Sequence, residues 1–303
     1  FLVVESARRA AGWVLGIFIL IVSTYPLFAQ YMPGILQGPS RSFLLTAQFH
    51  MLGIDSAMGL VVRMFGDLLL GYILFGAAVV ATGGGQFFLN LALSLVGHTR
   101  GGPAKVSVIA SFLFGTLSGS APVNVLTTGC VTIPAMKKVG YAPHDAGAVE
   151  CCASTAGTLT PPVMGANAFL MASYLNIPYA YVAMAAAIPA ILYYWGLFIQ
   201  VDGYAAKARL GSLAEEVPPL IETLKVGWFY LPVVAVLAYY LFVLRAEHEA
   251  PYVATAAMLV LAQIRKQTRL TWQGFLGFLE KTGQTAIELF SVLIAVGMLM
   301  GAF

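Results

Sequence analysis

Apolar residues fill most of the chain in long runs that short polar segments separate. A helix that crosses a membrane needs about 20 apolar residues, because the hydrocarbon core is about 30 Å thick. Runs of about that length with little or no charge cover residues 10–29, 58–82, 178–200, 226–244 and 284–303. The run 250–264 is shorter and could span the membrane with help from its flanks. The pattern predicts an all-α polytopic membrane protein.

The composition agrees with this class of protein. Hydrophobic residues make up 59% of the chain and charged residues 10%, and the mean hydropathy is +0.84. Soluble domains carry about 25% charged residues. The net charge of +3 is small and says little about partners; we expect no nucleic-acid partner. We therefore expect the lipid bilayer to be the main surroundings of the chain.

One uncharged run, residues 106–136, carries the polar sequence GTLSGSAPVN at its centre, residues 115–124. Basic residues flank the run at both ends, and basic residues favour the cytoplasmic side. Each half has twelve residues, about 18 Å of helix, which is about half of the membrane core. We expect a re-entrant hairpin over residues 104–138 with its tip near the membrane midplane. The alternative, one kinked helix, would place one basic end outside.

A second polar interruption, STAGTLTPPVMGAN, covers residues 154–167. Glycine, tandem proline and five hydroxyl or amide side chains predict a break within a helix over residues 147–172. Two broken helices of this kind are typical of the ion sites of transporters, because unwound carbonyls and side-chain oxygens suit Na⁺. The alternative is that the small residues only allow close packing between helices.

Glu150 lies just before the second interruption. Acids inside membranes are functional candidates by default. We favour a position near the cytoplasmic end of the broken helix, where Glu150 would act as an interfacial cap rather than an ion ligand.

An enzyme is the less favoured alternative. The sequence LSGSA could suggest an intramembrane serine hydrolase, but such a serine needs a base within hydrogen-bond reach. The histidines, His50, His98, His144 and His248, fall in or near expected loops. We expect no enzymatic activity and no organic cofactor. A channel and a non-transporting scaffold fragment also stay open as alternatives.

Two long segments resemble one known family. They are GTLSGSAPVNVLTTGCVTIPAMKKVGY and GAVECCASTAGTLTPPVMGANAFLMASYLNIPY, and shorter stretches, VVESARRAAGW, RGGPAK and IPAILYY, fit as well. Together they resemble the large membrane (permease) subunit of TRAP transporters, of the TAXI type, in which small and large subunits are often fused. The sequence departs from the commoner family pattern at Pro122 and at Cys151-Cys152.

The resemblance implies an inverted-repeat, elevator-type fold, of which this chain covers the first repeat and the start of the second. It implies Na⁺-driven uptake of a small organic anion of the carboxylate class, through a multi-pass permease in a bacterial or archaeal cytoplasmic (inner) membrane. The implied partners are a periplasmic substrate-binding protein and a small membrane subunit, separate or fused.

The resemblance also assigns segments and site residues. The segments are scaffold helices 1–83, a cytoplasmic interfacial helix 84–103, a transport-domain core 104–201 that ends in helix 178–201, a cytoplasmic connector 202–225 and further transmembrane helices 226–303. Expected Na⁺ ligands are Ser118, Ser120, Asn124, Ser154, Thr155, Gly157, Thr158 and Pro161. Residues expected near the substrate are Gly119, Thr127, Thr160 and Asn167.

Overall fold

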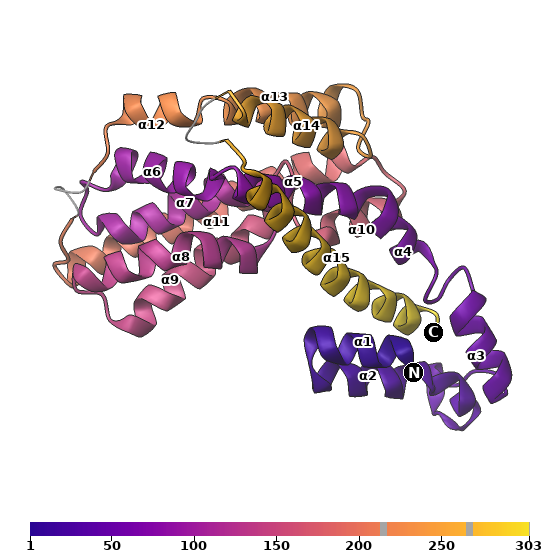
Figure 1. Ribbon diagram of the computed structural model, residues 1–303. Helices are drawn as coiled ribbons and strands as arrows, with labels where there is room; N and C mark the ends of the chain where they lie inside the picture. The colour runs from indigo at the N-terminus through magenta and orange to yellow at the C-terminus, as the bar shows by residue number, and fades with distance from the viewer. Residues whose placement is uncertain (213–216, 265–268, 303) are drawn as a thin grey trace. The chain divides into compact units, whose positions relative to one another are not determined.

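The computed structural model describes residues 1–212, 217–264 and 269–302, and in these ranges it contains helices and no strands (Figure 1). The expected all-helical class is confirmed. Residues 213–216 of the expected connector, and residues 265–268 and 303 of the expected C-terminal helices, lie outside the described residues. The chain divides into two units, residues 1–70 with 280–303, and residues 71–279.

The first unit is built from short helices. They are α1 (Leu2–Ala11), α2 (Trp13–Ser23), α3 (Phe43–Leu52), α4 (Leu60–Met64), the 3-10 turns Tyr25–Leu27, Ala29–Tyr31 and Gly34–Leu36, and the π turn Phe65–Leu69. The end of α15 (Trp272–Met300) completes the unit, where Ala7, Ile19 and Ala295 form a buried apolar cluster.

The prediction of one spanning helix over residues 10–29 is wrong. Gly12 has φ 90°, which separates α1 from α2, and α2 ends at Ser23, before a 3-10 turn that contains Pro26. A positive φ is a conformation that glycine adopts without steric cost, and proline has no backbone N–H to continue a helix. The high apolar content of this run does not reveal either break.

The second unit holds most of the helices. They are α5 (Leu70–Ala81), α6 (Gly84–Val96), α7 (Gly102–Ser118), α8 (Ala121–Lys138), α9 (Pro143–Thr155), α10 (Ala166–Leu175), α11 (Tyr179–Lys207), α12 (Leu220–Gly227), α13 (Tyr230–Ala238), the π turn Tyr239–Val243, α14 (Ala250–Ala262) and the start of α15. Helices α7, α8, α9 and α11 lie side by side in Figure 1.

Within the described residues, three helical segments are long and apolar enough to cross a membrane: Leu60–Ala81, Tyr179–Lys207 and Trp272–Met300. Helices of sufficient length thus lie at the runs 58–82 and 178–200, and the helix expected at 284–303 begins earlier, whereas their passage through a membrane stays a prediction. The span predicted at 226–244 is instead a pair, α12 and Tyr230–Val243, with a bend of 58°. A helix is also confirmed within the predicted interfacial segment, as α6, although its place at a membrane surface stays a prediction.

The 104–138 segment forms a hairpin of two helices, not one kinked helix. Asn124 Nδ2 of α8 donates to the Ser111 carbonyl of α7 at 2.9 Å, and the Ser111 and Thr128 hydroxyl oxygens lie 3.3 Å apart. Pairing of residue 111 with residues 124 and 128 requires the arms to run antiparallel. The arms have 17 and 18 residues rather than the expected twelve, because both helices continue past the uncharged run. The re-entrant placement of the hairpin stays a prediction.

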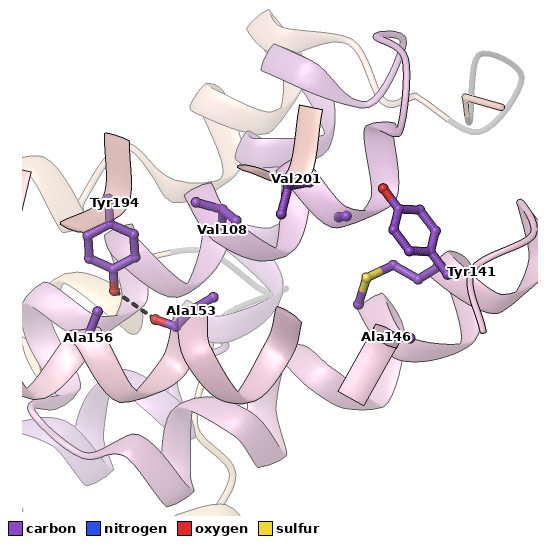
Figure 2. Packing of buried hydrophobic residues seen from close by; sticks show 9 residues of the cluster. Val108, Tyr141, Ala146, Ala153, Ala156, Tyr194 and Val201 are labelled. Carbon is purple, nitrogen blue, oxygen red and sulfur yellow. Dashed lines mark hydrogen bonds between the residues drawn. The ribbon is translucent and has the colours of Figure 1, made fainter. Parts of the chain in front are cut away.

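A buried apolar cluster holds the hairpin against α9 and α11 (Figure 2). Val108 of α7, Ala153 of α9 and Val201 of α11 belong to it, and the Tyr194 hydroxyl donates to the Ala153 carbonyl at 2.9 Å. Alanine side chains are small, so the helix backbones can approach closely, which is the usual packing in membrane bundles. This packing fixes the positions of the two polar interruptions.

Candidate functional site

The hairpin tip is very short. Only Gly119 and Ser120 separate α7 from α8, and Gly119 has φ 58°, in the left-handed region. A Cβ atom on Gly119 would lie 2.0 Å from the Met164 carbonyl oxygen. Glycine is therefore needed both for the turn and for the approach of residue 164. Pro122 falls in the first turn of α8, where its missing N–H needs no intrahelical partner.

The second interruption meets the hairpin tip through the backbone. Helix α9 ends at Thr155, a 3-10 turn covers Ala156–Leu159, and α10 begins at Ala166. The Val163 N–H donates to the Thr116 carbonyl at 3.1 Å, and the Gly165 N–H donates to the Thr158 carbonyl at 2.7 Å. The break predicted within 147–172 is confirmed, and the structure brings the two interruptions into contact.

A pair of glycines makes this contact closer. A Cβ atom on Gly115 would lie 2.6 Å from the Cα atom of Gly157, and Asn124 Nδ2 packs against both glycines. Asn124 is fully buried. The backbones of α7 and of the second interruption therefore touch without side chains between them.

Tyr179 supports the second interruption from α11. Its buried hydroxyl lies 2.8 Å from the carbonyl oxygens of both Pro162 and Val163. Its ring stacks on Phe169 of α10, with the ring centroids 4.2 Å apart. This side chain fixes the irregular segment between α9 and α10.

The predicted Na⁺ ligands lie in two settings. Asn124, Ser154 and Gly157 are buried between the hairpin and the second interruption, and the Ser118 Oγ atom is buried with no partner among the described residues. The others lie at the edge of this region: Ser120 is the N-cap residue of α8, Pro161 is partly buried, and the exposed Thr155 and Thr158 donate to backbone carbonyls nearby.

The predicted substrate-proximal residues lie further apart. Gly119 is at the tip, and the buried Thr160 hydroxyl donates to the Ala156 carbonyl. Thr127 packs its methyl group against Gly85 of α6, whereas Asn167 and Thr158 line a cavity of about 470 Å³ beside α10 and α11. The remaining lining of this cavity is mostly apolar.

Glu150 is the most densely hydrogen-bonded group of the region. It is fully buried in the middle of α9, and five hydroxyl groups surround its carboxylate. They come from three helices: Ser107 and Ser111 of α7, Thr128 and Thr132 of α8, and Ser154 of α9. The interpretation of Glu150 as an interfacial cap is wrong, because α9 begins at Pro143 and carries Glu150 into the packed interior.

The sequence analysis missed four of these hydroxyl groups, although the sequence holds a signal for them. Ser107 and Ser111, Thr128 and Thr132, and Glu150 and Ser154 are each four residues apart. Residues four apart on a helix lie on one face, so each pair predicts a polar stripe. Three such stripes on neighbouring apolar helices must face one another, because lipid offers no hydrogen bonds.

Comparison with known proteins assigns the family. The family model described as "Tripartite ATP-independent periplasmic transporter, DctM component" matches residues 1–303. The chain belongs to this DctM family of TRAP transporter large permeases. The family expected from the two interruptions is thereby confirmed, whereas the TAXI type and the fusion to a small subunit are not.

Several curated relatives share parts of the DctM sequence. The C4-dicarboxylate TRAP transporter large permease protein DctM of Pseudomonas aeruginosa is 31% identical over 52% of this chain and 38% of its own length. The sialic acid TRAP transporter large permease protein SiaM of Vibrio cholerae is 28% identical over 60% of this chain and 40% of its own length. The isethionate TRAP transporter permease protein DctMQ of Oleidesulfovibrio alaskensis is 30% identical over 50% of this chain and 28% of its own length. The chain thus spans less than half the length of the curated relatives it matches.

Proposed function

We propose that this chain is part of the permease of a Na⁺-driven secondary transporter that takes up a small organic anion of the carboxylate class. The anion is delivered by a periplasmic binding protein, and the permease moves it by an elevator mechanism in the cytoplasmic membrane of a bacterium or archaeon. The function is transport rather than catalysis.

One observation supports this proposal best: the contact between the hairpin tip and the second interruption. Irregular backbone within a membrane is tolerated where protein or a watery cavity covers it. Here the Val163 N–H donates to the Thr116 carbonyl across the contact, and Gly119 lies against the Met164 carbonyl. Two broken helices that meet in this way are the usual construction of a transporter ion site.

The atoms at the contact fit Na⁺. Hard cations prefer oxygen ligands, and carbonyl, hydroxyl and amide oxygens gather here. The buried Ser118 Oγ atom has no partner among the described residues, although a buried hydroxyl without a hydrogen bond is costly. Ser118, Asn124 and the carbonyls of the second interruption would hold the ion, whose binding would order the tip.

The substrate class and the partners rest on the relatives. Their names refer to C4-dicarboxylates, sialic acid and isethionate, and each of these is an organic anion at neutral pH. The name DctMQ also supports a small membrane subunit, separate or fused, as a partner. The quoted motifs support membership of the TAXI type. The coupling ion is the only cofactor that we propose.

Substitution of two oxygen ligands in the full-length permease tests the proposal. Asn124→Ala and Ser118→Ala should each raise the Na⁺ concentration for half-maximal uptake about tenfold, since loss of a buried oxygen ligand is comparable to an unsatisfied buried group, which costs about 1–3 kcal/mol. Thr255→Val is the control, because the Thr255 hydroxyl donates to a backbone carbonyl and lies in α14. Unchanged Na⁺ dependence in both variants would contradict the assignment.

A further inference from the structure

The two oxygens of the Glu150 carboxylate have different surroundings. Oε2 accepts a hydrogen bond from Ser107 at 2.7 Å and another from Thr132. Oε1 faces Thr128 at 2.5 Å, Ser154 at 3.0 Å and Ser111 at 3.4 Å. One oxygen is therefore fixed by two donors, whereas the other belongs to a larger group of oxygens.

Within the group around Oε1, the Ser111 hydroxyl is only loosely hydrogen-bonded, whereas Thr128 and Ser154 lie closer to Oε1. The Ser111 Oγ atom lies 3.3 Å from Thr128 Oγ1, 3.3 Å from Ser154 Oγ and 3.4 Å from Glu150 Oε1. Hydroxyl hydrogen bonds usually measure about 2.7–2.8 Å. Oxygens that share a small cation at about 2.3–2.6 Å lie about 3.3–3.7 Å from one another when they subtend a right angle. The three long separations have the spacing of a cation's ligands.

Charge balance also favours a cation. Every hydrogen-bond partner found for the carboxylate among the described residues is a neutral hydroxyl group, and Glu150 is fully buried. Hydroxyl groups can hold the ionised form, but they leave its charge uncompensated, and a buried charge without a counter-charge is costly. A single bound cation would remove that cost.

The charge of the cation follows from the number of acids. The described part of the chain contains no group of three or more His, Cys, Asp or Glu side chains that could hold a metal ion. One carboxylate balances one positive charge, so the site suits a monovalent cation rather than Ca²⁺ or Zn²⁺.

The Asn124 Oδ1 atom lies 3.4 Å from Thr128 Oγ1 and connects the oxygens around Glu150 Oε1 to the hairpin contact.

We propose that Glu150 Oε1, with the hydroxyl oxygens of Ser111, Thr128 and Ser154, binds a monovalent cation, Na⁺ in the working transporter. This inference rests on the proposed function and adds one anionic ligand to an ion-binding region whose other expected ligands are neutral. Ser107 and Thr132 hold Oε2 and orient the carboxylate.

The test measures thermal unfolding of the purified full-length permease in detergent at fixed pH. NaCl replaces choline chloride at constant ionic strength, with KCl as a second series. Wild-type protein should gain stability as Na⁺ rises, because a ligand that binds only the folded state stabilises it. Glu150→Gln keeps the shape of the side chain and removes its charge. It should raise the Na⁺ midpoint, the Na⁺ concentration that gives half of the stabilisation, at least about tenfold, because the ion loses its attraction to a buried unit charge.

Two threonines provide a matched pair if Glu150→Gln fails to fold. Thr128 and Thr132 both lie on α8, both are buried and both donate to Glu150, but to different oxygens. Thr128→Val should raise the Na⁺ midpoint about tenfold, because it removes an oxygen ligand of the ion. The free-energy cost of that loss is comparable to the cost of leaving a buried polar group without a hydrogen bond. Thr132→Val should lower the unfolding temperature at every Na⁺ concentration and leave the midpoint unchanged.

The outcomes separate this inference from the proposed function. A wild-type midpoint in Glu150→Gln, or equal midpoints in the two threonine variants, would overturn the Glu150 site. Na⁺-driven uptake without Na⁺-dependent stabilisation of the wild-type protein would also overturn the site but leave the proposed function standing. Loss of both uptake and stabilisation by Na⁺ in the wild-type protein would overturn both.

Discussion

Replacement of Gly119 by alanine should destabilise the protein more than any other single alanine substitution at the hairpin tip. Gly119 has φ 58°, and a Cβ atom there would lie 2.0 Å from the Met164 carbonyl oxygen and 3.3 Å from a methyl group of Val163. The added methyl group must therefore push the second interruption away from the tip.

The magnitude follows from two additive costs. A left-handed conformation costs a residue other than glycine about 1–2 kcal/mol. Overpacking by one methyl group costs about 1–3 kcal/mol, and here the obstacle is backbone, which moves less readily than a side chain. The sum is about 2–5 kcal/mol, which corresponds to a fall of roughly 4–20 °C in unfolding temperature at about 2–4 °C per kcal/mol.

Thermal unfolding of the detergent-purified, full-length permease measures this effect. Gly115→Ala isolates the steric cost, because its Cβ would lie 2.6 Å from the Gly157 Cα atom without a positive φ at residue 115. Gly147→Ala is the control, since that glycine of α9 has nothing within 4 Å, and alanine favours a helix by up to about 1 kcal/mol. A Gly119→Ala protein within about 2 °C of wild type would refute the close contact, since two costs of at least about 1 kcal/mol each are expected.

Three further predictions concern the same unit. Cysteines placed at the exposed His98 and Lys137, in a background without native cysteines, should both resist an impermeant thiol reagent in intact cells; labelling of one alone would contradict the re-entrant hairpin. Tyr179→Phe leaves two carbonyls of the second interruption without their donor and should lower stability by about 1–3 kcal/mol, whereas Tyr193→Phe, whose exposed hydroxyl meets one carbonyl, should cost less. Partial burial raises the pKa of the Glu247 carboxyl above its usual value, so its contribution to stability should fall as the pH rises through that pKa; Glu247→Gln should flatten this part of the profile, and an unaltered profile would exclude the effect.

The sequence predicted the breaks within α7–α8 and α9–α10 correctly, because their residues leave few alternatives. Gly119 allows a left-handed turn, and the tandem prolines between α9 and α10 cannot continue a helix. Local chemistry of this kind acts in any tertiary context. At residues 10–29 the high apolar content predicted one continuous helix, whereas the positive φ of Gly12 divides it.

The position of Glu150 could not be predicted from its own surroundings in the chain. Its neighbours Cys151 and Cys152 are exposed, and nothing local distinguishes a buried acid from an interfacial one. Its environment is made by Ser107 and Thr132, which are far away in sequence and are placed by packing between three helices. The four-residue spacing of hydroxyl groups on α7 and α8 was the available signal.

In the transport function that we propose, Na⁺ bound between the two interruptions drives uptake of an organic anion. Proteoliposomes that hold the full-length permease with its small subunit, and a cognate binding protein outside, measure this directly. An inward Na⁺ gradient should drive accumulation of a labelled organic anion, and K⁺ in place of Na⁺, or omission of the binding protein, should abolish it. Equal accumulation without Na⁺ would contradict Na⁺-driven transport.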